Sequence, residues 1–476
     1  MNFVSYAFLL LLGVVLIGRL VLGPRKIESP YVALLLVASV LFYGWHVPVY
    51  LLILVGSTAV DYVAARAMGP RPTVDAPASQ RRTLALIASL TTNLGLLGFF
   101  KYGDFGLESL AALLQSIGVE VSLPTIGLAL PMGISFYTFQ SMSYTIDVYR
   151  GRLAPCERFG RLFLFVAFFP QLVAGPIVRA SEFLPQLDRP RRLRARVVTE
   201  GLYLIVLGYF LKMVCADNLG VYVDGHWNSG YEPGASPWLL VWLTLLFSGQ
   251  IFSDFAGYTA IARGAAFLLG YRLPLNFNSP YVAGTFKNFW ERWHMTLSRW
   301  LRDYLYIPLG GNRGSSARTY VNLLVVMVLG GFWHGAALPF LAWGLLHGAA
   351  LAVERVTGMH QQRVPRPLIL RLAWFLVVQL IVLVTWIFFR SETIGDAVRF
   401  IGNIGGGGDG PFPAEVFWVG LLFLLPVIVM HVWRALVEGG QVRDLGPFGK
   451  AITSGAMLFG IASAYGGSDA FIYFQF

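Results

Sequence analysis

Charged residues are scarce in this chain. Asp, Glu, Lys and Arg make up 13% of its 476 residues, whereas soluble globular proteins carry about 25%. Apolar residues account for 56%, and no polar stretch is long enough to build a sizeable soluble domain. The composition therefore excludes an ordinary soluble protein. It predicts an all-α polytopic membrane protein with a single integral membrane domain over residues 1–476.

Cysteine is also rare, and several chemical motifs are missing. Cys156 and Cys215 are the only cysteines, and both flank segments expected on the cytoplasmic side, so we expect no structural disulfide. The sequence has no HExxH or cysteine–histidine ligand spacing, no GxSxG elbow and no phosphate-binding loop. We therefore expect no metal and no permanently bound cofactor.

The net charge of +11 lies mostly in short loops between apolar runs. That placement is typical of basic loops on the cytoplasmic face of a membrane protein, so we expect no nucleic-acid partner. The first apolar run, Phe3 to Leu22, lacks a basic leader and indicates a spanning helix rather than a cleaved signal peptide.

Apolar runs of membrane-spanning length recur along the chain. A span needs roughly 20 apolar residues, and we expect about 11 spans. They lie near residues 3–22, 31–46, 48–65, 83–101, 199–216, 237–253, 318–333, 337–354, 371–389, 415–433 and 450–465. Two further runs, Leu123–Val148 and Leu162–Ile177, are broken by Pro and Gly, which favours re-entrant or tilted pieces lining a central tunnel. We expect N-terminal spans over about 1–101, a catalytic core over about 123–390 and C-terminal spans and tail over about 415–476.

The Lys and Arg bias of the loops sets the expected orientation. Basic loops mark the cytoplasmic side, and they include Arg25, Lys26, Arg66, Arg71, Arg81, Arg82, Arg150, Arg152, Arg158, Arg161, the run Arg189–Arg196, Arg355, Arg363, Arg366, Arg371, Arg434, Arg443 and Lys450. Both termini then fall on the outer side. The Arg189–Arg196 run serves best as a topology anchor, with an anionic-ligand or lipid-headgroup site as the alternative.

The densest group of polar residues runs from Tyr281 to Gly314. Helical spacing within this stretch predicts an amphipathic helix with one apolar face, formed by Trp290, Trp293, Leu297 and Trp300–Leu301. It would also form two i,i+4 ion pairs, Lys287 with Glu291 and Arg299 with Asp303. An interfacial anchor explains the tryptophans and arginines. It explains His294 less well.

Three histidines stand in apolar surroundings. His294 and His334 are functional candidates, because polar groups at bilayer depth are costly and histidine moves protons near neutral pH. Gly335 follows His334, and small neighbours would let a substrate approach the imidazole closely. Each histidine has the alternative of being a satisfied core group, and we favour that alternative for His347.

Four stretches resemble the membrane-bound O-acyltransferases. They are Phe169–Ile177 (FPQLVAGPI), Phe252–Tyr258 (FSDFAGY), Phe289–Arg313 and Phe332–Gly348. They follow one another over most of the chain and are most similar to the branch that O-acetylates bacterial polysaccharides such as alginate. The D-alanyl transfer proteins of teichoic acid modification are more distant.

That resemblance implies roles for particular residues. It implies that His334 is catalytic and that His294 is its partner near a tunnel through the membrane, and it gives His347 no role. Further residues are weaker expectations for substrate or donor binding: Asn288, Arg292, Trp293, Arg302, Trp333, Ser253 and Asp254.

The chain ends in Phe471-Ile472-Tyr473-Phe474-Gln475-Phe476. Composition alone favours a short amphipathic tail on the membrane. The ending also resembles the Phe-x-Tyr-x-x-Phe ending of acyl-relay peptides, in which a tyrosine hydroxyl carries the acyl group. Because the loop charges place this tail outside, we expect Tyr473 to be an outer-face acyl carrier.

These features together predict acetyl transfer across a bacterial inner membrane. The donor would be acetyl-CoA or an acyl-carrier phosphopantetheine thioester, His334 the general base and Tyr473 the attacking hydroxyl. Expected partners are membrane lipid, a periplasmic SGNH-type O-acetyltransferase and the polysaccharide synthesis complex. The alternatives are a transporter or flippase of an acyl donor or lipid-linked sugar, and a scaffold without chemistry.

Overall fold

The computed structural model describes residues 1–23, 30–70, 79–188, 192–361 and 366–466. Every regular element in that part of the chain is a helix, which confirms the all-α prediction. Several residues used above lie outside the described residues: Arg25, Lys26, Arg71, Arg189, Arg191, Arg363 and Tyr473.

Long apolar helices confirm the polytopic class. Seven described segments are long and apolar enough to cross a membrane: Tyr50–Met68, Gln80–Ser116, Ala195–Tyr231, Pro237–Leu269, Ser316–His334, Leu368–Arg390 and Ala414–Glu438. Two shorter apolar helices precede them, Tyr6–Leu22 and Pro30–Gly44. A helix overlies each of the expected spans, including the two that fall short of this criterion near residues 337–354 and 450–465.

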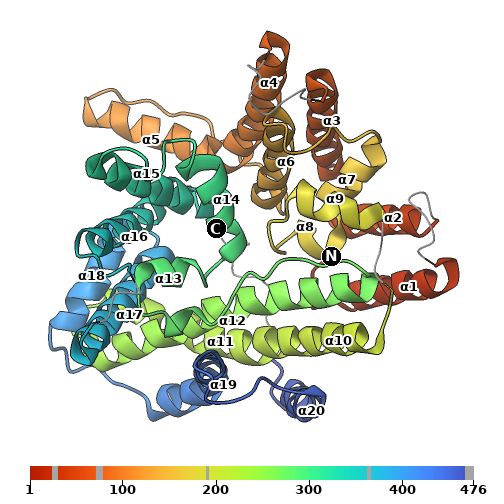
Figure 1. The fold of residues 1–476 in the computed structure, drawn as a ribbon. Coiled ribbons are helices and arrows are strands. Elements are labelled where there is room, and N and C mark those ends of the chain that lie inside the picture. Colours follow the sequence, from red (N-terminus) through yellow and green to blue (C-terminus); the bar gives the residue numbers. More distant parts are fainter. Residues whose placement is uncertain (24–29, 71–78, 189–191, 362–365, 467–476) are drawn as a thin grey trace. The chain divides into compact units, whose positions relative to one another are not determined.

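The chain divides into two compact units, and the first comprises residues 1–205 and 261–274. Its elements are α1 (Tyr6–Leu22), α2 (Pro30–Gly44), α3 (Tyr50–Met68), α4 (Gln80–Leu97), η1 (Gly98–Tyr102), α5 (Gly103–Ser116), α6 (Ile134–Tyr149), α7 (Phe159–Ala167), α8 (Phe169–Leu172), α9 (Ala180–Asp188), most of α10 (Ala195–Tyr209) and the end of α12 (Pro237–Leu269). Figure 1 shows α1 to α9 in red to yellow.

The second unit comprises residues 206–260 and 275–476. Besides the rest of α10 and α12, its elements are η2 (Phe210–Ala216), α11 (Asp217–His226), η3 (Trp227–Tyr231), η4 (Pro280–Val282), α13 (Phe286–Trp290), α14 (Met295–Leu301), η5 (Arg302–Tyr306), α15 (Ser316–His334), α16 (Leu338–Val356), α17 (Leu368–Arg390), α18 (Ile394–Gly405), α19 (Ala414–Glu438) and α20 (Pro447–Ser463). Both candidate histidines lie in this unit.

The two interrupted runs break where their Pro and Gly residues predict. Residues 119–131 form no helix, and α6 starts after Gly133, which has a φ of 73°. A side chain at Gly133 would place its Cβ 2.5 Å from the Leu172 carbonyl oxygen, so only glycine fits. In the second run α7 ends at Ala167, and the extended Phe168 separates it from α8.

A polar network joins α3, α4 and α6 inside the first unit. The buried Asp61 carboxylate accepts hydrogen bonds from Ser89 Oγ at 2.6 Å and from Asn93 Nδ2 at 2.8 Å. Ser89 Oγ also lies 3.0 Å from Thr145 Oγ1. These three long helices are thus fastened by hydrogen bonds where apolar packing alone would leave their rotation undetermined.

Helices α15 and α16 pack backbone against backbone in the second unit (Figure 1). A Cβ at Gly331 would lie 2.2 Å from the Phe340 carbonyl oxygen, and one at Gly344 would lie 2.3 Å from the Met327 carbonyl oxygen. Small residues allow such close approach between membrane helices. The contact fixes the end of α15, where His334 stands, against α16, which carries His347.

The amphipathic helix expected within the Tyr281–Gly314 stretch is interrupted in the structure. After η4 the stretch holds α13 and a second helical run in which α14 leads directly into η5, and the chain leaves helical geometry between Glu291 and His294. Trp290, Trp293, Leu297 and Trp300 therefore do not form one continuous helical face. The Lys287–Glu291 ion pair is confirmed at 3.8 Å. Asp303 pairs with its neighbour Arg302 at 2.7 Å, and the Arg299–Asp303 pair stays a prediction.

Candidate active site

His294 sits in a left-handed turn that breaks the helix. Its φ is 40° and its ψ is 52°, and the residue is fully buried. Non-glycine residues in this conformation cost on the order of 1–3 kcal/mol and persist where the surroundings hold them, often at functional sites. The backbone strain thus marks His294 as a site residue independently of its sequence context.

Asn276 holds that turn from a neighbouring segment. Its carbonyl oxygen accepts from the Met295 N–H at 2.9 Å, and its side-chain Oδ1 accepts from both Thr296 N (3.2 Å) and Thr296 Oγ1 (2.9 Å). Asn278 N donates to the Arg292 carbonyl at 3.0 Å. The segment 276–278 therefore forms hydrogen bonds with the chain on both sides of His294. The sequence reasoning missed Asn276 and Thr296.

The hydrogen bond at the ring of His294 sets its tautomer. Nδ1 accepts from the Leu297 N–H at 3.3 Å, which makes His294 the N-cap of α14. Nε2 therefore carries the proton and is a donor. Burial lowers the pKa of His294 to about 3, so the ring is neutral at physiological pH.

His334 and His294 lie close together in the structure. His334 is the last residue of α15 and is buried, with its ring centroid 6.4 Å from that of His294. The rings of Trp333, Trp343 and Phe389 surround it at centroid distances of 5.0, 5.2 and 5.4 Å. The two imidazoles, 40 residues apart in sequence, thus lie within one cluster of aromatic side chains. We call this cluster the aromatic chamber.

Gly335 does not serve the role expected from its size. A Cβ there would lie 2.0 Å from the Phe340 ring, so the missing side chain makes room for Phe340 rather than for a substrate. Phe340 in turn packs edge-on against Phe389 at 5.0 Å. Gly335 therefore supports the wall of the chamber.

Trp293 and Trp333 belong to the same chamber. Trp333 lies 6.1 Å from His294 by ring centroids. Trp293 is buried, stacks on Phe289 at 5.8 Å and contacts Trp386 at 4.9 Å. Both tryptophans form walls around the histidine pair.

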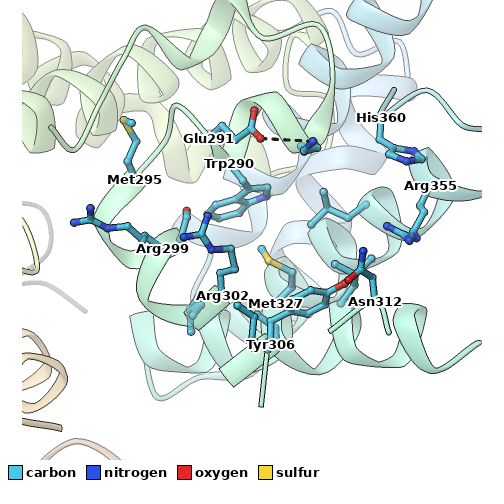
Figure 2. A pocket seen from close by; sticks show the side chains of 17 residues that line it. Trp290, Glu291, Met295, Arg299, Arg302, Tyr306, Asn312, Met327, Arg355 and His360 are labelled. Atoms are coloured by element: carbon cyan, nitrogen blue, oxygen red, sulfur yellow. Dashed lines mark ion pairs between the residues drawn. The ribbon is translucent and has the colours of Figure 1, made fainter. Parts of the chain in front are cut away.

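A basic pocket of about 670 Å³ adjoins this region in the same unit. Its charged and polar lining includes Lys287, Glu291, Arg299, Arg302, Asn312, Arg355 and His360 (Figure 2). Trp290, Met295 and Met327 provide apolar walls. Of the residues expected to bind the donor, Arg302 lines this pocket.

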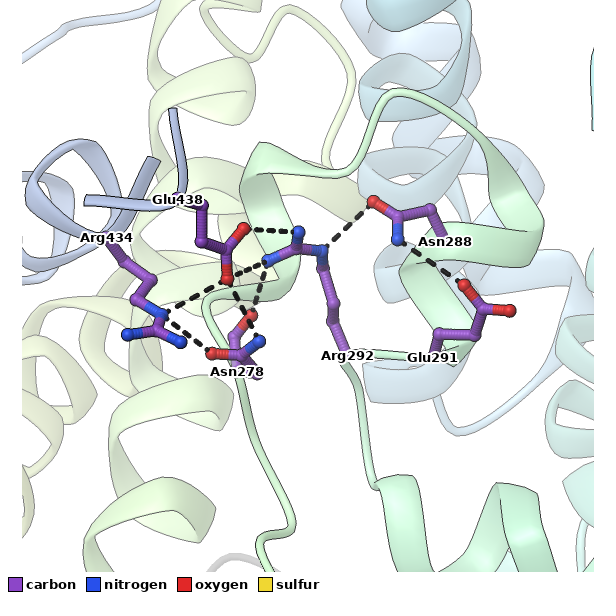
Figure 3. Close-up of polar contacts among 6 residues, drawn as sticks. All are labelled: Asn278, Asn288, Glu291, Arg292, Arg434 and Glu438. Atoms are coloured by element: carbon purple, nitrogen blue, oxygen red, sulfur yellow. Dashed lines mark hydrogen bonds and ion pairs between the residues drawn. The ribbon is translucent and has the colours of Figure 1, made fainter. Parts of the chain in front are cut away.

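Arg292 and Asn288 face a different set of partners (Figure 3). Arg292 binds Glu438 through Nη2 at 2.6 Å and Nη1 at 3.3 Å, and its Nε donates to Asn288 Oδ1 at 3.0 Å. Arg434 Nε donates to the same Glu438 at 3.1 Å and to Asn278 Oδ1 at 3.2 Å. The guanidinium of Arg292 thus fastens the His294 segment to the end of α19. Donor binding by Arg292 or Asn288 stays a prediction.

Asp254 belongs to a buried ion triad. Lys212 Nζ lies 2.9 Å from Asp254 Oδ1 and 2.6 Å from Asp217 Oδ1, and all three side chains are buried. Asp254 precedes Phe255, whose ring lies 4.8 Å from that of His294. Ser253 is also fully buried. The triad links η2 and the start of α11 to α12, next to Phe255 and so close to the His294 ring. A direct part of Ser253 or Asp254 in the chemistry stays a prediction.

Comparison with known proteins identifies the class. The model of the membrane-bound O-acyltransferase family (MBOAT) matches residues 159–391. The probable alginate O-acetylase AlgI of Pseudomonas aeruginosa is 38% identical over 399 residues, covering 84% of this chain and 74% of that protein. The peptidoglycan O-acetyltransferase of Helicobacter pylori is 38% identical over 397 residues, covering 77% and 72%. The teichoic acid D-alanyltransferase of Bacillus subtilis is 28% identical over 231 residues, covering 46% and 58%.

The chain belongs to the membrane-bound O-acyltransferase family and is an acyltransferase. Its relatives named as alginate and peptidoglycan O-acetylases are more similar to it than those named as teichoic acid D-alanyltransferases. The family decides for an enzyme over the transporter and scaffold alternatives.

Proposed function

We propose that this enzyme moves an acetyl group from a cytoplasmic thioester across the bacterial inner membrane for O-acetylation of an exported polysaccharide. The observation that carries the proposal is the buried His294–His334 pair, with ring centroids 6.4 Å apart, in the unit that also holds the basic pocket. Relatives named as O-acetylases of alginate and of peptidoglycan support an acetyl group and a glycan.

The basic pocket is the proposed entrance for the donor. Lys287, Arg299, Arg302 and Arg355 match the phosphates of acetyl-CoA or of an acyl-carrier phosphopantetheine. Its volume of about 670 Å³ falls in the range of small-molecule sites. The thioester is a substrate, and the enzyme needs no resident cofactor for this step.

The two histidines divide the chemistry. The attacking hydroxyl oxygen bonds to the thioester carbonyl carbon while the His334 imidazole accepts its proton. His294, whose Nε2 bears hydrogen, donates to the carbonyl oxygen and stabilises the developing charge. The carbon–sulfur bond then breaks, and the thiolate takes the proton from His334, which returns the base to its starting state.

The proposed acceptor is Tyr473, which yields an O-acetyl tyrosine and a free thiol. A tyrosine hydroxyl with an unperturbed pKa near 10 needs a base at pH 7, which is the task of His334. With both termini on the outer side, the ester would be delivered to a periplasmic SGNH-type O-acetyltransferase. That partner, within the polysaccharide synthesis complex, would pass the acetyl group to a sugar hydroxyl.

Two substitutions in the producing cell test this function. His334→Ala and Tyr473→Phe should each abolish polysaccharide acetylation, while the exposed His46→Ala should leave it unchanged. Mass spectrometry of the C-terminal peptide should find an acetyl mark on Tyr473 in the wild type and none in His334→Ala. Full acetylation in His334→Ala at normal protein level would contradict the role of His334, and full acetylation in Tyr473→Phe would remove Tyr473 as carrier.

A further inference from the structure

Three neighbouring rings between the basic pocket and His334 each carry a buried nitrogen. Trp290 Nε1, Trp343 Nε1 and His347 Nδ1 are all buried and have no hydrogen-bond partner within the described part of the chain. The His347 ring lies 5.1 Å from that of Trp290 and 4.8 Å from that of Trp343, and the two indoles are 5.7 Å apart. Buried polar atoms are nearly always hydrogen-bonded, so this cluster calls for a ligand.

The cluster bridges the donor pocket and the catalytic base. Trp290 lines the pocket and is labelled there in Figure 2. On the other side, the Trp343 ring lies 5.2 Å from that of His334. A thioester that enters through the pocket and presents its carbonyl to His334 would therefore pass these three side chains.

The partner of His347 determines what the cluster offers. Thr385 Oγ1 donates its single hydrogen to the Val382 carbonyl at 2.8 Å and lies 3.0 Å from His347 Nε2. The hydroxyl oxygen therefore accepts from Nε2–H, and Nδ1 is left as an acceptor. The cluster thus presents two indole N–H donors and one imidazole acceptor.

That set is the complement of a secondary amide, whose carbonyl oxygen accepts two hydrogen bonds and whose N–H donates one. The pantetheine arm, between the phosphates and the thiol of the donor, contains two such amides. We propose that Trp290, Trp343 and His347 form a subsite for an amide of this arm. The inference rests on the proposed thioester donor and assigns a function to His347, for which sequence favoured a core role.

The test compares donors that contain or lack the amide. His347→Phe keeps a ring and loses the acceptor, and Trp343→Phe keeps a ring and loses a donor. Each should lower kcat/KM for acetyl-CoA about 10-fold through KM, the effect of losing one buried hydrogen bond. With S-ethyl thioacetate, which has no amide, kcat/KM should change less than about 2-fold. The exposed His46→Phe is the control for both donors.

The outcomes separate this subsite from other roles. Equal losses with both donors would mean that the residues only position His334, and no loss with either would mean that no amide binds here; both results overturn the subsite. If His347→Phe fails to fold, Trp290→Phe gives the same comparison. An acetylated phosphopantetheine carrier should show the same loss as acetyl-CoA, because it has the same arm. Absence of wild-type turnover with either natural donor would instead refute the proposed function.

Discussion

The candidate histidine His294 is held by hydrogen bonds between the residues that follow it and a segment about 18 residues earlier in the chain. His294 keeps its left-handed conformation because Asn276 and Thr296 bond across the turn at 2.9–3.2 Å. Its neutral ring can donate one hydrogen bond from Nε2, and we propose that His334 supplies the base. The division of labour thus depends on backbone geometry as much as on the imidazoles.

Removing the Asn276 side chain should misplace His294. Asn276→Ala loses both hydrogen bonds to Thr296, and we expect kcat to fall about 10- to 100-fold because the donor to the carbonyl shifts. KM for acetyl-CoA should stay within about 3-fold, because Asn276 does not line the donor pocket. Steady-state kinetics of the purified protein, supplied with its acetyl-accepting partner, measures both constants. A loss confined to KM, or unchanged kcat, would contradict the positioning role.

The buried His294 should make stability depend on pH. A histidine in the unfolded chain titrates near 6.5, while burial lowers the pKa of His294 to about 3 in the folded protein. Between these values only the unfolded chain binds the proton, so the free energy of unfolding falls as pH drops below about 6.5.

His294→Asn is the matched variant for this prediction, because asparagine tolerates the left-handed conformation and does not titrate. The thermal midpoint in detergent should fall less between pH 7 and about 4.5 for this variant than for the wild type. Parallel pH curves for the two proteins would show that His294 is not held neutral by burial.

The sequence alone identified the two candidate histidines but not the residues that hold them in place. His294 and His334 stand out as polar residues in apolar stretches, and Lys212 was visible on the same ground but was overlooked. Asn276 gave no comparable signal, because its role arises only when an extended segment meets the turn. The tautomer of His347 likewise depends on Thr385, 38 residues along the chain.

At the scale of elements, contact between α15 and α16 fixes the chamber. Their glycines bring the backbones together, and His334 at the end of α15 depends on that register. The glycines could be seen in the sequence, but which helix they face could not. The break of the 281–314 segment was missed because its helical spacing hides a turn that only tertiary contacts stabilise.

Gly344→Ala should separate these helices. The new methyl group would lie 2.3 Å from the Met327 carbonyl oxygen, a backbone atom that cannot move alone. We expect a loss of about 1–3 kcal/mol in the free energy of unfolding, together with reduced turnover. Gly13→Ala in α1 is the control, because its Cβ would meet nothing within 4 Å. Thermal unfolding of both variants checks the prediction, and equal midpoints would contradict the close packing.

At the scale of the whole molecule, composition and periodicity were enough for the class. The all-α polytopic architecture is confirmed. The membrane-bound O-acyltransferase family, which the sequence indicated only through the resemblance of four stretches, is confirmed as well. The single-domain boundaries, the side on which each terminus lies and the polysaccharide partner stay predictions. The side of each terminus depends on the bilayer, which the sequence reflects only through the charge of its loops. The partner depends on other proteins.

We propose that His334 is the general base for acetyl transfer from a thioester. The most direct measurement of this role is release of free CoA from labelled acetyl-CoA by purified protein, wild type against His334→Ala. For the wild type we expect a burst of CoA release matched by labelling of the protein, and for the variant a burst rate lower by about 10²–10⁴-fold. Equal CoA release by folded His334→Ala would contradict it.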